Sequence, residues 1–213
     1  MKRLSYTLAA FTLGAFLLVG CAKENNKYDK ILTEGTWTVS TMEMNEEEVV
    51  FDLNVGSPNE TATSTTNISV AGGKRTSTYS DVLAVVGATN STEVIELEED
   101  FSSTMTFTEE GIYSSSLTNE ITNYKNVVDG VVVFDGGVTT DPSTSTVSDI
   151  WAWANTANTK TQITFDGATY NITVEKGKIT LTISTSSETV QVTSPTNTKT
   201  VTRTMTTTIV ATR

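Results

Sequence analysis

The chain has 213 residues and a formal net charge of -11, and it contains no histidine. An acidic surface repels nucleic acid and anionic lipid heads, so we expect no nucleic-acid partner. The absence of histidine excludes Ser-His-Asp and Cys-His nucleophile systems, histidine-ligated zinc or iron, and a histidine general base. Threonine makes up about a fifth of the residues and only three prolines occur, a composition that favours an all-β chain.

The first twenty residues have the pattern of an export signal. Lys2 and Arg3 precede an apolar stretch, residues 8–19, that is too short to cross a membrane as a stable helix. Residues 18–21, Leu-Val-Gly-Cys, resemble the bacterial lipobox, and this resemblance implies cleavage before Cys21 and a diacylglycerol on its thiol. The alternative for this single cysteine is a buried or reactive thiol. Cleavage removes two basic residues and leaves a charge of 14 - 2 - 25 = -13.

A lipidated Cys21 predicts that a membrane is the partner of this protein. Each buried methylene of an acyl chain contributes roughly 0.8 kcal/mol, so two or three chains hold the protein permanently. Ala22 replaces the aspartate associated with retention at the inner membrane, which favours the outer membrane. Lys23-Glu24 resembles part of the short signal that brings Bacteroidetes lipoproteins to the cell surface, although Asn25 replaces its second acid. Surface display and a domain facing the periplasm remain the alternatives.

Residues 21–33 are expected to form a polar tether that ends in one helical turn, and residues 34–213 a single domain. The first strand begins at Gly35-Thr36-Trp37. A two-residue period places Trp37 on one face of this strand and Met42 and Met44 on the other. A separate strand is expected at 48–53.

The rest of the chain has the pattern of short strands joined by turns. Residues 54–90 carry a weaker pattern, with turns at 56–59 and 72–74, a strand at 66–70 and an apolar run at 82–86. Beyond them, strands are predicted at 92–98, 103–108, from 112 onward, and at 131–134, 151–154, 162–165, 170–174, 178–184 and 200–212. Glu-Glu-Gly, Asp-Gly and Lys-Gly sequences mark turns between them. Strands at this spacing predict a closed barrel or a sandwich.

This arrangement resembles the lipocalin-like domains of small lipoproteins from Gram-negative bacteria of the Bacteroidetes type. The features that carry the resemblance are Gly35-Thr36-Trp37, the hairpin 107–113, a strand with Trp151, the hairpin 170–183 and a last strand with Arg203. The resemblance implies a single antiparallel up-and-down β-barrel of about eight to ten strands, in which Trp37 closes the narrow end and Arg203 packs across it. Residues 54–90 and 117–149 exceed that family's compact core. They are either lid loops over an open barrel end or extra edge strands.

The resemblance also implies a small apolar or amphipathic ligand, because an eight-stranded barrel has room for side chains or one small ligand. Thioethers and aromatic rings adapt to varied shapes, and the candidate lining residues are of these kinds: Met42, Met44, Met105, Phe107, Tyr113, Trp151 and Trp153. Ordinary core packing is the alternative for each of them. Arg203 also has two alternatives, which are a structural lock on Trp37 and a contact with an anionic ligand head.

We therefore expect a non-enzymatic, monomeric binding protein without a cofactor or metal. The acid clusters 46–48 and 96–100 lack the alternating loop of a calcium motif, which favours solvated strand faces. The rival expectation is a structural or adhesive surface module with a filled core that binds a protein or glycan. A hydrolase with two carboxylates in a cleft is a third class. A cavity of several hundred cubic ångströms favours the ligand, and a solid core favours the rival.

Overall fold

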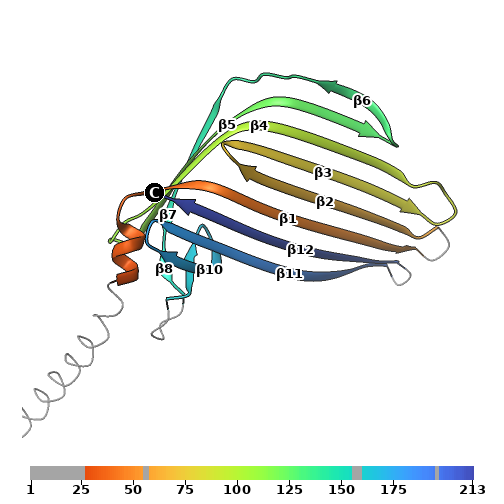
Figure 1. Cartoon of the computed structure of the whole chain (residues 1–213). Helices are drawn as coiled ribbons and strands as arrows, with labels where there is room; N and C mark the ends of the chain where they lie inside the picture. The colour runs from red at the N-terminus through yellow and green to blue at the C-terminus, as the bar shows by residue number, and fades with distance from the viewer. Residues whose placement is uncertain (1–26, 55–57, 155–159, 195–196) are drawn as a thin grey trace, which may run out of the picture.

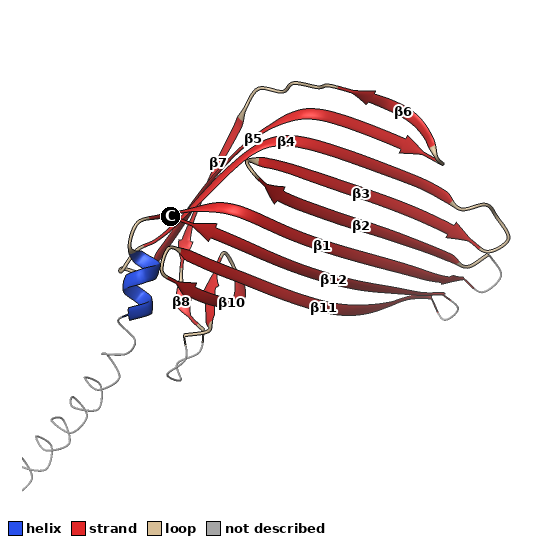
Figure 2. Ribbon diagram, in the orientation of Figure 1, coloured by secondary structure: helices blue, strands red, loops and turns tan. Residues whose placement is uncertain are grey.

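The computed structural model describes residues 27–54, 58–154, 160–194 and 197–213. These residues form a short helix, 27–33, and twelve strands in an antiparallel sheet (Figure 2). The expected all-β class is confirmed, whereas twelve strands are more than the eight to ten that we expected. No helix in this part of the chain is long and apolar enough to span a membrane.

The strands follow one another with short turns between most of them. In chain order they are β1 (Thr36–Asn54), β2 (Glu60–Ala71), β3 (Lys74–Val85), β4 (Ser91–Phe107), β5 (Ile112–Val128), β6 (Val131–Gly136), β7 (Ser143–Ile150), β8 (Ala152–Trp153), β9 (Gln162–Phe165), β10 (Ala168–Glu175), β11 (Lys178–Ser194) and β12 (Asn197–Thr212). Tight turns use glycine at positive φ, as at Gly111 (81°) and Gly130 (76°), where a side chain would be strained.

Most strands pair with the strand that precedes them in the sequence. The order across the sheet is β6-β5-β4-β3-β2-β1-β12-β11-β10-β9-β8, and β7 pairs with β5. Figure 1 shows a strongly curved sheet that narrows toward the helix, where β8 and β10 lie. The first and last long strands, β1 and β12, therefore meet in the middle of the sheet.

At the narrow end the strands are linked in a ring. β1 pairs with β4 at residues 36–38, so β2 and β3 separate these strands only farther along. β7 pairs with β5 and runs through Trp151 directly into β8, which pairs with β9. Away from the ring the described sheet is open, and its edges are β6 and residues 183–192 of β11. We call the ring and the helix the packed end, and the remainder of β1 to β6, β11 and β12 the extended sheet.

The hydrophobic core lies at the packed end. Its buried side chains come from the helix and most strands of the ring: Leu32, Trp37, Met105, Phe107, Tyr113, Trp151, Ile163, Phe165, Ile172, Ile179, Leu181 and Ala211. Leu32 is fully buried, so residues 27–33, which we expected in the polar tether, pack as part of the domain. Because apolar burial is the main stabilising term, at about 25 cal/mol per Å², the packed end holds the fold together.

One bulge decides which side chains of β1 face inward. The register of β1 on β12 shifts at Ser40, which is an extra residue in β1. Met42 and Met44 therefore lie on the same face as Trp37, and our expectation that they lie on the opposite face is wrong. We call the face of the sheet that continues the core the inner face.

Several expected strands are parts of longer ones. The segments predicted at the start of the domain and at 48–53 both belong to β1, and the segments 92–98 and 103–108 both belong to β4. Acidic residues, Glu46-Glu47 and Glu99-Asp100, interrupt the apolar pattern between these segments, but pairing on both sides keeps the backbone extended. Pairing with neighbouring strands therefore overrides the local sequence signal.

The two long segments are strands rather than lid loops. Residues 58–90 form the β2–β3 hairpin around Gly72-Gly73, and residues 55–57 lie outside the described residues. Residues 117–149 supply the far part of β5, all of β6 and most of β7. Of the two alternatives, extra strands are confirmed for both segments, but β2 and β3 are not edge strands, because they lie between β1 and β4, whereas β6 lies at an edge of the sheet.

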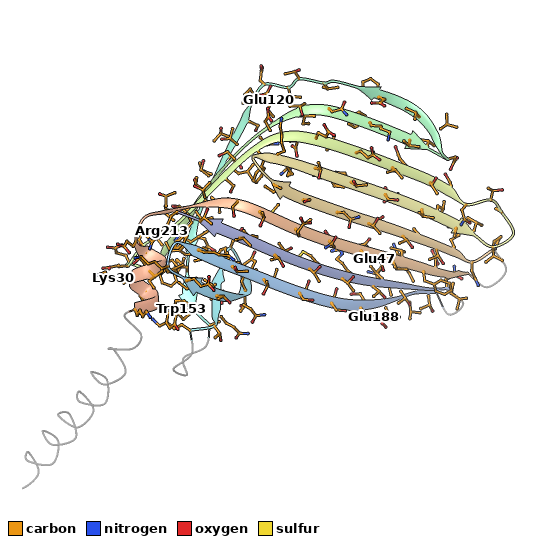
Figure 3. All side chains as sticks on the ribbon, viewed as in Figure 1. Lys30, Glu47, Glu120, Trp153, Glu188 and Arg213 are labelled. Carbon is orange, nitrogen blue, oxygen red and sulfur yellow. The ribbon has the colours of Figure 1, made fainter. Side chains whose placement is uncertain are left out.

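Trp37 lies at the centre of the packed end, but its arginine partner is Arg213. Trp37 is fully buried, its Nε1 donates a hydrogen bond to the Leu32 carbonyl at 2.9 Å, and the Arg213 guanidinium lies 4.6 Å from its ring centre. Arg203 instead forms an exposed ion pair with Glu48. The expected pairing of Trp37 with Arg203 is wrong because Arg203 is ten residues earlier on β12, about 33 Å along the strand. Figure 3 shows Arg213 beside the helix and Glu47 far along the sheet.

Candidate ligand-binding site

The side chains that we expected to line a ligand site lie in three places. Met105, Phe107 and Tyr113 are in the core, Trp151 and Trp153 lie beside the helix, and Met42 and Met44 lie on the inner face.

Met105, Phe107 and Tyr113 pack as ordinary core residues. The Phe107 ring centre lies 5.2 Å from that of Tyr113, 5.6 Å from that of Phe165 and 5.8 Å from that of Trp151. Burial raises the pKa of the Tyr113 hydroxyl, because its charged form loses solvation. These three side chains fill the packed end and stabilise it.

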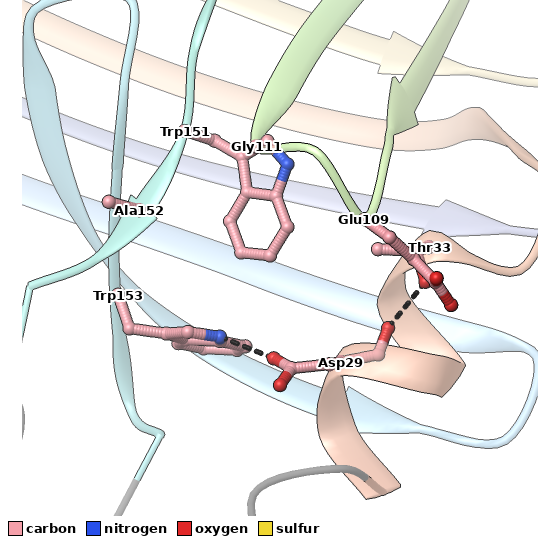
Figure 4. Close-up of a pocket in the computed structure, with 7 residues that line it drawn as sticks. All are labelled: Asp29, Thr33, Glu109, Gly111, Trp151, Ala152 and Trp153. Atoms are coloured by element: carbon pink, nitrogen blue, oxygen red, sulfur yellow. Dashed lines mark hydrogen bonds between the residues drawn. The ribbon is translucent and has the colours of Figure 1, made fainter.

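Trp151 and Trp153 line a pocket of about 460 Å³ beside the helix (Figure 4). Their rings meet edge to face with centres 5.9 Å apart. Trp153 Nε1 donates to Asp29 Oδ1 at 2.6 Å, and Trp151 Nε1 donates to the Thr108 carbonyl at 3.0 Å. Asp29 also forms an ion pair with Lys160, whose ammonium lies 5.1 Å from the Trp153 ring centre.

These contacts hold the helix against the ring. Asp29 belongs to the helix, and Trp153 belongs to β8. Both indole N–H groups and the Asp29 carboxylate already bond to protein groups. A polar ligand would have to displace those bonds, so we interpret this pocket as the seam along which the helix docks.

Beyond the core, the inner face continues as three rows of side chains across the strands. Residues that lie directly opposite in a sheet share a face, so the register defines each row. The first row is Ile183, Thr207, Met44, Ile68, Ser77, Leu97 and Tyr124. The second is Thr185, Met205, Glu46, Thr66, Tyr79, Ile95 and Asn126. The third is Ser187, Arg203, Glu48, Ser64, Asp81, Glu93 and Val128.

The first two rows combine apolar side chains with buried polar atoms. Met44, Leu97 and Ile95 are half-buried. Ser77 is 1% exposed, and its Oγ has no hydrogen-bond partner among the described residues; Asn126 Oδ1 is likewise buried without a partner. Buried polar atoms are nearly always hydrogen-bonded, and an unpaired one costs about 1–3 kcal/mol. The half-buried apolar side chains of these rows remain partly open to a bound molecule, which distinguishes the inner face from the pocket at the helix.

A buried ion pair separates the core from these rows. Glu99 is 2% exposed, forms an ion pair with Arg75, and accepts a hydrogen bond from Asn119 Nδ2 at 2.7 Å on its Oε1. The Arg75 guanidinium lies 5.5 Å from the centre of the Phe101 ring. Because both carboxylate oxygens have partners, Glu99 is a structural group rather than a vacant site.

Sequence reasoning missed Glu99 because it treated residues 96–100 as a solvated acid cluster. A signal was nevertheless present in the alternation of β4. Glu99 has the same parity as Phe101, Met105 and Phe107, all of which are buried. A residue of that parity faces inward, so the alternation predicts one buried acid within the cluster.

The third row carries charges. Arg203 Nε donates to Glu48 Oε2 at 2.7 Å, and this hydrogen bond raises the pKa of Arg203. Asp81 and Glu93 lie directly opposite each other and line a pocket of about 250 Å³. Within the described ranges, no three acids or cysteines gather in a way that could hold a metal ion.

Comparisons with family models, with curated proteins and with solved structures find no match to this chain. Only its own residues and their geometry therefore point to a function.

Proposed function

We propose that this chain is a non-enzymatic, lipid-anchored envelope protein whose lipocalin-like β domain binds a small hydrophobic or amphipathic molecule on its inner face. The observation that carries the proposal is the set of half-buried apolar side chains in the first two rows, which include Met44, Ile95 and Leu97. The pairing of β1 with β4, which links the strands in a ring, supports the lipocalin-like part. The ligand would lie on the inner face of the extended sheet, beyond the filled core, and not within the core.

The anchor in this proposal is Cys21, which lies outside the described residues. Six residue steps separate Cys21 from Lys27, where the description begins, and a fully extended chain of that length spans about 20 Å. An acylated Cys21 therefore keeps the helix and the packed end next to the membrane. Intact-mass analysis of the native protein tests the acylation. Protease treatment of whole cells separates display on the outer surface from a periplasmic position.

Binding of a neutral apolar dye tests the ligand site. The chain from Ala22 to Arg213 retains every described residue, and titration with Nile red should give saturable fluorescence enhancement. Met44→Glu places a charge among the apolar side chains of the first row, which should weaken dye binding at least tenfold because burying an unpaired charge is costly.

Asn45→Glu is the matched control, because Asn45 is the neighbour of Met44 on the opposite face and is exposed. This variant should bind the dye like the parent chain. Absence of dye binding by the parent, or equal losses in the two variants at unchanged melting temperature, contradicts the inner-face site.

A second candidate function is a structural or adhesive module, and the filled core favours it. Large apolar side chains are also exposed at the far ends of the hairpins: Phe51, Leu53, Leu83, Val86, Val131, Val132, Val133, Phe134, Val190 and Val192. An adhesive module would bind a protein or glycan through these ends. Its binding would survive Met44→Glu and be lost on Val132→Ser with Val133→Ser, which is the opposite of the ligand proposal.

The acid pair in the third row does not favour a hydrolase. Asp81 and Glu93 project side by side from neighbouring strands and both are exposed. Glycoside hydrolases hold their two carboxylates on either side of a substrate in a cleft, whereas these two side chains lie exposed on one face of the sheet. We therefore keep the non-enzymatic proposal.

A further inference from the structure

We propose that the molecule taken up on the inner face is a cationic amphipath, with its alkyl chain on the first two rows and its positively charged head at Asp81 and Glu93. This inference rests on the ligand-binding function proposed above and adds the charge class of the ligand.

The charges of the second and third rows do not balance. These rows hold four carboxylates and one guanidinium: Glu46, Glu48, Asp81, Glu93 and Arg203. Arg203 is already bonded to Glu48. Among the ion pairs of the described residues, none includes the other three carboxylates. Glu93 accepts a hydrogen bond from the neutral amide Asn126 Nδ2 at 3.0 Å, which leaves its charge uncompensated.

Asp81 and Glu93 form a like-charge pair directly across two strands. Such pairs are disfavoured. On the outer face Asp100 also lies opposite Glu120, but there Lys74 on the neighbouring strand forms an ion pair with Asp100. A cation between Asp81 and Glu93 replaces their repulsion with two attractions.

The space at this pair suits a head group with an apolar attachment. The pocket of about 250 Å³ is lined by both carboxylates and by Ala62, Ser64, Leu83 and Ser91 among others. Pockets that take up a whole small ligand measure about 300–1,000 Å³, so this smaller space suits the head group alone. The first row begins four residues along β3, at Ser77, or about 13 Å from Asp81 at strand spacing. An alkyl chain that runs from the head along Ile95 and Leu97 covers that distance.

The apolar rows and the acid pair lie on one face of the sheet, because Ser77 of the first row and Asp81 of the third row point to the same side of β3. The apolar rows favour an alkyl chain, and the acid pair favours a positively charged head group. The acid pair repels the head group of an anionic amphipath, so fatty acids are the class that this face rejects.

Three dodecyl probes that differ only in their heads test the inference. Calorimetric titration of the chain from Ala22 to Arg213 with dodecyltrimethylammonium, dodecyl maltoside and dodecanoate, each below its micelle concentration, gives three dissociation constants. We expect the cation to bind at least about tenfold more tightly than the anion, a difference of about 1.4 kcal/mol, with the neutral probe between them. Asp81→Asn with Glu93→Gln should remove most of this preference while dodecyl maltoside binds as before.

Glu47→Gln with Glu98→Gln is the matched control, because it removes two exposed carboxylates from the outer face. This variant should keep the preference of the parent chain. Equal losses in the two double variants would show non-specific attraction to an acidic protein and overturn the inference. Dodecanoate that binds as tightly as the cation would overturn it too, yet leave the ligand-binding function intact. Failure of all three probes to bind removes both proposals.

Discussion

The packed end and the extended sheet share the same long strands but bury them differently. On β12, Ala211 is fully buried under the helix and the ring, while Met205, on the same face, is half-buried. On β4, Phe107 is 1% exposed, while Ile95 is half-buried. The difference shows that one end of β4 and of β12 contributes to the closed core, whereas the other end leaves its inner-face side chains partly exposed. Stability and binding can therefore be separated by position along a strand.

Threonine explains how the extended sheet persists although the described residues form no second layer over it. Its branched Cβ favours extended backbone, and its hydroxyl tolerates water. In β12, Thr202, Thr204, Thr206 and Thr208 alternate with inner-face residues and lie between β1 and β11. Continuous pairing on both sides supplies the hydrogen bonds, while the packed end supplies most of the buried apolar area.

The largest expected effect is at the packed end. Trp37→Ala removes a fully buried ring together with the hydrogen bond to Leu32 and the contact with Arg213, so it should lower the free energy of unfolding by about 3–5 kcal/mol. Met44→Ala on the half-buried inner face should cost clearly less. Urea denaturation followed by circular dichroism measures both. Similar losses at the two positions would contradict the division into a stabilising end and an exposed sheet.

The buried ion pair at the boundary should give the next effect. Arg75→Met leaves the Glu99 carboxylate buried with only Asn119 as a partner, which should cost about 3 kcal/mol. Arg75→Met with Glu99→Met should recover most of that loss, because no buried charge remains. Unfolding curves of the single and double variants provide the comparison. A double variant as unstable as the single one would mean that the pair contributes through packing rather than charge.

Two arginines, Arg203 in β12 and Arg213 directly after it, provide a further comparison of the two regions. Arg213→Gln removes a guanidinium from the Trp37 ring and should cost about 0.5–1 kcal/mol. Arg203→Gln breaks an ion pair whose arginine side chain is 58% exposed, and such pairs contribute little, so its melting temperature should equal that of the parent chain. If Arg203→Gln is the more destabilising change, then the extended sheet matters to stability more than we infer.

The smallest expected effect on stability comes from two buried tyrosines, and it appears only at alkaline pH. Burial raises the pKa of Tyr113 and of Tyr170, which both lie at the packed end. A raised pKa in the folded state means that the stabilisation is complete below the ordinary tyrosine pKa of about 10 and is lost as the pH rises through the raised value. Urea midpoints measured from pH 9 to 11 should fall. Tyr113→Phe with Tyr170→Phe should flatten that fall, and an unchanged slope would contradict the assignment.

Turns were predictable from the sequence because their signal is local. The hairpin at Gly111, the Asp129-Gly130 turn and the Asp166-Gly167 turn all stand where the sequence places them, with φ positive at each glycine. Chain direction reverses there because few residues other than glycine adopt that φ. The all-β class followed from composition for a similarly general reason.

Faces and partners were not predictable, because they depend on register. One extra residue at Ser40 moved Met42 and Met44 to the inner face, and a one-residue shift reverses every side chain beyond it. The wrong arginine was assigned to Trp37 because an arginine contacts the core only if few residues of the strand separate it from the core. Neither the register nor this separation can be read from the local sequence.

The central claim is that ligand binds on the inner face of the extended sheet and that the core is filled. Four methionines lie beyond the proposed cleavage site, at positions 42, 44, 105 and 205, and their methyl groups report on both places in one carbon-13 NMR titration with dodecyl maltoside. We expect the Met44 and Met205 methyl resonances to shift while the buried Met105 methyl resonance stays in place. A shift of Met105 without Met44 and Met205, or no shift of any of them at saturating probe, would contradict the account.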